Sequence, residues 1–143
     1  MTYLTNANWS DDTFTYHVGD DVNADAVATA WSRWENVADI NAVKAGAESA
    51  DVYFTDNLGG DALAGLTWLW GSGSKVSNAL VLLNDAQMGE HTITHEIGNV
   101  LTLADRPGGI MQGRESRSGD FTDDVVQDVQ ALYGAPQSDM DGM

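Results

Sequence analysis

Hydrophobic residues recur every three or four positions in three parts of the chain, which is the spacing of one face of an α-helix. The first part covers residues 22–37, where Trp31 and Trp34 are the largest apolar side chains. The second part starts at Thr92 and the third follows Thr122. The pattern predicts three helices, and it places the two tryptophans in the core because large aromatic side chains bury the most area.

Five shorter segments are rich in β-branched and aromatic residues, as strands are. They cover residues 13–18, 40–44, 52–55, 67–70 and 79–84. Glycine-rich segments 56–61 and 71–74 lie between some of them. The first of these segments also carries carboxylates that can gather a calcium ion, and a plain turn is the alternative interpretation.

The last predicted helix has clear start and stop signals. Thr122 is its predicted N-cap, and Asp123 and Asp124 in the first turn suit the positive end of the helix dipole. Gly134 is the predicted C-cap, and Pro136 prevents continuation. The predicted buried stripe of this helix consists of Val125, Val129, Leu132 and Tyr133.

The composition limits the domain organisation, the partners and the kinds of metal site that the chain can have. With 143 residues, 43% of them hydrophobic, the chain suits one domain over residues 1–134 and an acidic, disordered tail over 135–143. It has 6 basic and 22 acidic residues, a net charge of −16, which argues against nucleic acid or anionic membranes as partners and favours solubility, cation binding or life in salt. There are no cysteines, so disulfides and thiolate zinc sites are excluded.

The helix that starts at Thr92 carries polar side chains on one face. On a helical wheel this face consists of Thr92, His95, Glu96, Asn99 and Thr102. The opposite face consists of Ile93, Ile97, Val100, Leu101 and Ala104. His95 and Asn99 stand one turn apart and project side by side, with Glu96 next to them. This geometry offers two ligands to one metal ion and a carboxylate to the water bound on that ion.

Residues 92–111 read T-I-T-H-E-I-G-N-V-L-T-L-A-D-R-P-G-G-I-M. This stretch resembles the zinc-binding helix of the metzincin metallopeptidases, whose pattern is H-E-x-x-H-x-x-G-x-x-H, with Asp last in some members, followed by a Met-turn. The resemblance implies that Glu96 is the general base, that His95, Asn99 and Asp105 occupy the metal-ligand positions, and that Met111 lies below the metal. The sequences A-D-V-Y-F at 50–54 and D-V-Q-A-L-Y-G at 128–134 also resemble serralysin and matrixin catalytic domains.

The resemblance implies an α+β fold with a twisted, mostly parallel sheet and an antiparallel edge strand. It also implies two long helices, one of which carries the His-Glu pair, and a C-terminal helix. Strand 79–84 is similar to the edge strand that lies beside the substrate, so an extended peptide would add to it as a further strand. The expected substrate-binding residues are Leu80, Val81, Leu82 and Leu83.

The motif departs from the family pattern at two positions. Asn99 stands where the second histidine belongs, and an amide oxygen is a weaker zinc ligand than an imidazole nitrogen. Thr102 stands where a glycine turns the chain so that the last ligand returns to the metal. Either Thr102 adopts a strained positive φ, or the helix continues and Asp105 points elsewhere. Asp105 as the last ligand has a precedent in the snapalysin-like members.

A second metal geometry stays open within the same helix. His91 and His95 are also four residues apart, so they could chelate one metal a turn earlier, with Glu90 or Glu96 as an additional ligand.

Three hypotheses about function follow. The chain is a zinc-dependent metalloendopeptidase-type domain, weakened or inactive because of Asn99 and Thr102; alternatively it is a pseudopeptidase that binds peptides, or an engineered inactive variant. We expect weak zinc binding or none, with calcium as a second candidate cation. The expected partner is a peptide or protein substrate, without nucleic acid or membrane, bound by a monomer. The resemblance implies an extracellular location, although the first ten residues do not form a secretory signal.

Overall fold

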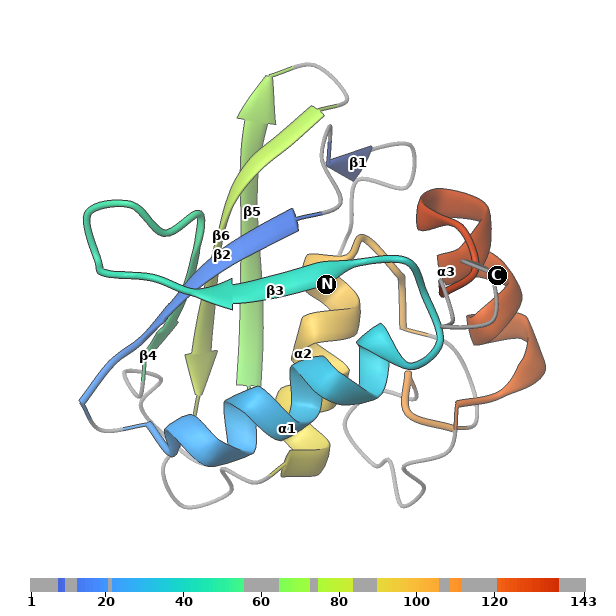
Figure 1. The fold of residues 1–143 in the computed structure, drawn as a ribbon, viewed down its shortest axis with the longest axis horizontal. Helices are drawn as coiled ribbons and strands as arrows, with labels where there is room; N and C mark the ends of the chain where they lie inside the picture. Colours follow the sequence, from blue (N-terminus) through green and yellow to red (C-terminus); the bar gives the residue numbers. More distant parts are fainter. Residues whose placement is uncertain are drawn as a thin grey trace, which may run out of the picture.

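The computed structural model describes residues 8–9, 13–20, 22–55, 65–72, 75–83, 90–105, 109–111 and 121–136. These residues form an α+β fold in which three helices accompany a mixed sheet (Figure 1). The elements in chain order are β1 (Asn8–Trp9), β2 (Thr13–Val18), α1 (Ala24–Glu35), β3 (Asn41–Lys44), β4 (Val52–Thr55), β5 (Gly65–Ser72), β6 (Lys75–Leu83), α2 (Glu90–Val100) and α3 (Asp123–Tyr133).

The sheet is mostly parallel and has one antiparallel strand. Its strand order is β1-β6-β4-β2-β3, and β5 pairs with β6 on the other side. All pairs are parallel except β5 with β6. The mostly parallel sheet with an antiparallel edge strand is therefore confirmed, but the prediction that strand 79–84 is that edge is wrong. Strand β6 lies between β4 and β5, and the antiparallel edge strand among the described residues is β5.

Helix α1 agrees with its predicted span, with two residues fewer at each end. It starts at Ala24 because the side chain of Asn23 accepts a hydrogen bond from the amide of Ala26 at 3.1 Å. Trp31 and Trp34 are almost completely buried, as predicted. Trp31 stacks on Phe14 of β2 with ring centroids 5.7 Å apart, so α1 is packed onto the sheet through aromatic contacts.

Helix α3 starts and ends where its sequence signals predict, but one of its predicted core residues is wrong. Val125 and Val129 are fully buried, and Tyr133 packs against the core. Leu132 is instead exposed. The hydroxyl of Tyr133 donates to the carbonyl of Leu101 at 3.0 Å, which ties α3 to the turn that follows α2.

Among the described residues, no helix has the length and apolar content needed to span a membrane. Several predictions lie outside the described residues: the calcium-loop interpretation of 56–61, the second half of the 71–74 connection, and the part of the tail at 137–143. The segments at 106–108 and 112–120, which flank the predicted Met-turn, also lie outside them.

Candidate functional site

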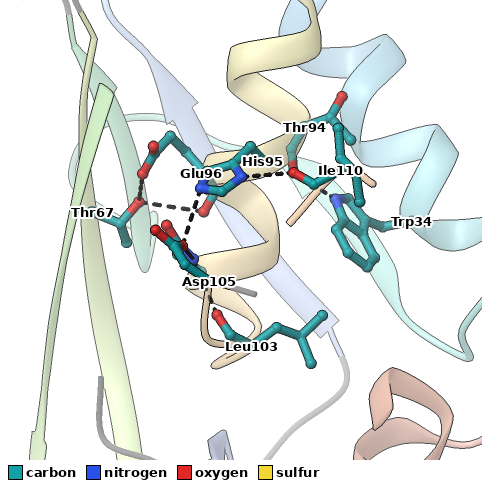
Figure 2. A network of polar contacts seen from close by, with 9 residues as sticks. Trp34, Thr67, Thr94, His95, Glu96, Leu103, Asp105 and Ile110 are labelled. Atoms are coloured by element: carbon teal, nitrogen blue, oxygen red, sulfur yellow. Dashed lines mark hydrogen bonds and ion pairs between the residues drawn. The ribbon is translucent and has the colours of Figure 1, made fainter. Parts of the chain in front are cut away.

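Helix α2 is buried on its polar face as well as on its apolar face. Ile93 and Ile97 are fully buried, as the apolar pattern predicts, but Glu96 and Asn99 are also buried. The side chain of Trp34 in α1 donates to the carbonyl of Thr94 at 2.8 Å, which fixes how α1 crosses α2 (Figure 2). Glu96 and Asn99 therefore lie inside the protein, where each of them needs a hydrogen-bond partner.

The turn after α2 returns the chain to His95. Thr102 has φ of 74°, the left-handed conformation, and it is the non-glycine residue with positive φ among the described residues. The amide of Leu103 donates to the carbonyl of Gly98 at 3.0 Å, which closes the end of the helix. Of the two alternatives at this position, the strained turn is the one observed, and Asp105 comes back to the helix.

His95 is held at both ring nitrogens. Its Nδ1 atom lies 2.7 Å from the carbonyl oxygen of Ile110, and its Nε2 atom lies 3.2 Å from Oδ1 of Asp105 (Figure 2). A carbonyl can only accept, so Nδ1 carries a proton and donates it. Neutral His95 would then turn the Nε2 lone pair toward the Asp105 carboxylate, which is unfavourable unless a cation lies between them. A proton on Nε2 satisfies this arrangement, and a metal ion is the other candidate.

The charges around His95 favour the protonated ring. Burial by itself lowers the pKa of His95, but the hydrogen bond to Asp105, the charge of Glu96 and the carbonyl of Ile110 raise it by more in total. The pKa of His95 therefore lies above its ordinary value of 6.5. A metal ion at this position has to displace that proton.

Asn99 meets the same carboxylate, but as a donor. Its Nδ2 atom donates to Asp105 Oδ1 at 3.2 Å and to the carbonyl of Leu103 at 3.0 Å. To become a metal ligand, Asn99 would have to turn its amide oxygen toward the ion and lose both hydrogen bonds. His95 and Asp105 thus suit a metal site, whereas Asn99 does not suit it in this arrangement.

Glu96 lies next to His95 in α2, and a residue of strand β5 holds its side chain. Thr67 of β5 donates its hydroxyl to Oε1 of Glu96 at 2.6 Å (Figure 2). Burial and the charge of Asp105 raise the pKa of Glu96, while the Thr67 hydroxyl and His95 lower it; burial is the largest cause, and the pKa ends above its ordinary value. The sequence did not single out Thr67, although strand alternation against exposed Trp68 was the signal that it faces inward.

Met111, which the resemblance places below a metal ion, packs against α2. It is fully buried, and a Cβ added to Gly98 would lie 2.4 Å from Met111 Sδ and 2.8 Å from Trp34. The absence of a side chain at Gly98 therefore allows Met111 to approach α2 directly beneath the turn that bears His95.

The residues expected to bind substrate are divided between two faces of β6. Val81 and Leu83 are buried in the core, while Leu80 and Leu82 are half-buried on the other face. The backbone of β6 pairs with β4 and with β5 over this stretch, so it cannot accept another strand. The expectation that a peptide pairs with residues 80–83 is therefore wrong. Among the described strands, β5 is paired only along its β6 side.

No third imidazole, thiol or carboxylate joins His95 and Asp105 as a metal-holding group within the described part of the chain. His91, the alternative ligand, is the second residue of α2 and belongs to no such group there. A search against models of known protein families and a search of curated proteins find no match for this chain.

Proposed function

We propose that the chain is a metzincin-like metalloendopeptidase domain with an impaired metal centre, which binds zinc weakly and hydrolyses peptides slowly or not at all. One observation carries this proposal: Asp105 returns to His95 Nε2 at 3.2 Å through a turn with positive φ at Thr102. Helices often end in a left-handed turn, but a β-branched residue such as Thr102 rarely adopts it, so a chance His-Glu pair would seldom be accompanied by this turn. Buried Met111 and the adjacent Glu96 support the same interpretation.

The impairment follows from Asn99. In a peptidase of this class the zinc ion activates a water molecule, and it needs three protein ligands to do so. This chain offers His95 and Asp105, while the amide group of Asn99 is committed to Asp105 and Leu103. Two ligands bind zinc far more weakly than three, so we expect little metal and little hydrolysis.

Two further features support the proposal of a peptidase site. Glu96 is fixed by the Thr67 hydroxyl on β5, so a potential proton acceptor is attached to the edge strand itself. The outer edge of β5 is not paired with any other described strand, and an extended peptide can add to it through main-chain hydrogen bonds. The same resemblance supports an extracellular location, which we include in the proposal.

Hydrolysis of casein or gelatin by the wild-type chain and by the double variant Asn99→His with Thr102→Gly tests the proposal. We expect the double variant to retain zinc through dialysis and to cleave the substrate, and the wild type to do much less of both. The control is the triple variant that adds Glu96→Gln, which should keep zinc and lose cleavage, since an amide cannot accept the proton. A double variant that gains neither zinc nor cleavage contradicts the proposal.

A second candidate function is peptide binding without hydrolysis. The hydrogen bonds of Asn99 favour it, because they hold the site closed without a metal ion. On this interpretation a peptide pairs with β5, and its affinity is the same with and without a chelator. Loss of peptide binding on treatment with EDTA would exclude this candidate and favour the first.

A further inference from the structure

The face of the sheet away from α1 and α2 carries a row of aromatic and aliphatic side chains. Figure 1 shows α1 and α2 together on one side of the strands. On the other side, the register places His17 beside Tyr53, Tyr53 beside Leu80 and Leu80 beside Trp68. His17 and Tyr53 also touch, with ring centroids 5.8 Å apart. The row thus crosses β2, β4, β6 and β5 in sequence. We call this surface the open face.

Two tryptophans at the β5 end of the open face are strongly exposed. Trp68 is 53% exposed and Trp70 is 50% exposed, whereas Thr67 between the sheet and α2 is buried. Residues two apart in a strand project from the same face, roughly 6.5–7 Å from each other. Exposed apolar patches mark interaction surfaces, and aromatic side chains are enriched at such surfaces relative to the rest of a protein's exterior.

The net charge of the molecule indicates the charge that its partner carries. The net charge of −16 attracts cations and repels a second copy of the chain. Asp51, one residue before β4, is exposed, and its alternation with fully buried Val52 places its carboxylate on the open face. Its backbone lies next to β6, since its carbonyl accepts the amide of Ala79 at 2.9 Å. The faces of indole rings also attract guanidinium and ammonium groups. Aromatic rings, a carboxylate and a negative field together suit a cationic ligand.

We propose that the open face binds a basic peptide segment in an extended conformation. Alternate residues of such a segment are also about 6.5–7 Å apart, so successive arginines can stack on Trp68 and Trp70. Val52 pairs with Ala79 and Trp70 pairs with Asn78, so Asp51 lies across β6 from Trp70, and an arginine stacked on Trp70 can direct its guanidinium toward the Asp51 carboxylate. This surface is separate from the Glu96 site and from the backbone edge of β5, so the inference does not depend on the peptidase proposal.

Calorimetric titration with a blocked hexapeptide of alternating arginine and serine, in about 50 mM NaCl, tests the inference. The same peptide with citrulline in place of arginine keeps the planar shape, removes the charge and exchanges one NH2 donor group for an acceptor oxygen. We expect the arginine peptide to bind and the citrulline peptide to bind at least about tenfold more weakly. We also expect Trp68→Ala with Trp70→Ala to weaken the arginine peptide about tenfold, and Asp51→Asn about threefold.

Leu132→Ala is the matched control, since Leu132 is an exposed apolar residue on α3, and it should leave the affinity unchanged. Circular dichroism verifies that the tryptophan variant folds. Equal binding of the two peptides, or no loss of affinity in the tryptophan variant, overturns the inference. Binding of an uncharged xylohexaose instead of the peptide reassigns the open face to a glycan. Self-association in sedimentation that disappears in the tryptophan variant reassigns it to a second copy.

Discussion

Thr102 has a strained backbone, but its side-chain hydroxyl makes a contact with Tyr133. At φ of 74° a β-branched residue costs on the order of 1–3 kcal/mol relative to an unstrained one. The hydroxyl of Thr102 contacts the Tyr133 hydroxyl, which in turn donates to the carbonyl of Leu101 at 3.0 Å. A glycine would relieve the strain and lose this contact, so the two effects oppose each other.

We therefore predict that the effect of Thr102→Gly depends on Tyr133. In a Tyr133→Phe background, where the hydroxyl contact is already lost, Thr102→Gly should be more favourable by about 1 kcal/mol than in the wild type. Urea unfolding of the four chains of this double-mutant cycle measures the difference. Additive effects of the two substitutions would show that the contact stabilises nothing.

Glu96 gives a pH dependence at the same scale. The pKa of Glu96 in the folded protein lies above 4.5, chiefly because the side chain is buried. Below pH 4.5 Glu96 is protonated in both the folded and the unfolded state, so it does not lower the stability there. The cost of ionised Glu96 grows as pH rises through the folded pKa and is complete above it. Glu96→Gln removes the cost, so the melting temperature of the variant minus that of the wild type should increase from pH 4 to pH 8.

Glu48→Gln, at an exposed turn, is the control for this series. It should show no comparable trend in melting temperature with pH. A Glu96→Gln difference that stays constant across the range would contradict the predicted burial of an ionisable carboxyl.

At the scale of elements, α2 depends on close approach to its neighbours. A Cβ at Gly98 would overlap with Met111 Sδ at 2.4 Å and with Trp34 at 2.8 Å, both shorter than van der Waals contact. The helix can therefore lie on Met111 only if position 98 has no side chain.

We predict that Gly98→Ala destabilises the protein by about 1–3 kcal/mol, since the added methyl group forces Met111 or Trp34 to move. Gly46→Ala is the matched control, because no atom lies within 4 Å of its added Cβ, and it should change stability by less than about 0.5 kcal/mol. Thermal or urea unfolding measures both. Equal stability of the two variants would mean that α2 does not pack as described.

Local pattern predicted most elements, because periodicity is a property of each segment alone. The strands at 13–18 and 52–55 and the capped helix after Thr122 agree closely with the structure. The position of β6 was wrong because a run of apolar residues does not specify its partners, and an edge strand and an inner strand look alike when both are hydrophobic. The predicted burial of Leu132 was wrong because the packing of one helix end depends on segments that are distant in the sequence.

The site was predicted only in part, because local spacing does not contain contacts between separate segments. Spacing on one helix indicated His95 and Glu96, and the resemblance implied Asp105; the structure brings these three side chains close together. The role of Asn99 as a donor depends on the Leu103 carbonyl, whose direction is set by the Thr102 turn. Thr67 reaches Glu96 from another element, a contact that no local spacing contains.

At the scale of the whole molecule, charge is the dominant feature. With 22 acidic and 6 basic residues, the folded chain concentrates like charges that repel one another. Salt screens such repulsion over a Debye length of about 10 Å at 0.1 M and less at higher concentrations.

We predict that the melting temperature rises with sodium chloride between about 0.05 and 1 M at pH 7. Near pH 4.1, the isoelectric point of the sequence, the same salt series should have a much smaller effect, because the net charge is close to zero. A scan of melting temperature against salt at both pH values measures this. The same salt response at both would indicate preferential hydration instead of charge screening.

On the proposed function, Asn99 weakens zinc binding because its amide is held by Asp105 and Leu103. Competition titration with a zinc chelator gives the zinc dissociation constants of the wild type, Asn99→His and, as a control, Asn99→Ala. We predict that Asn99→His binds zinc on the order of a thousandfold more tightly than the wild type, and that Asn99→Ala resembles the wild type. Equal zinc affinity of the wild type and Asn99→His would contradict the account.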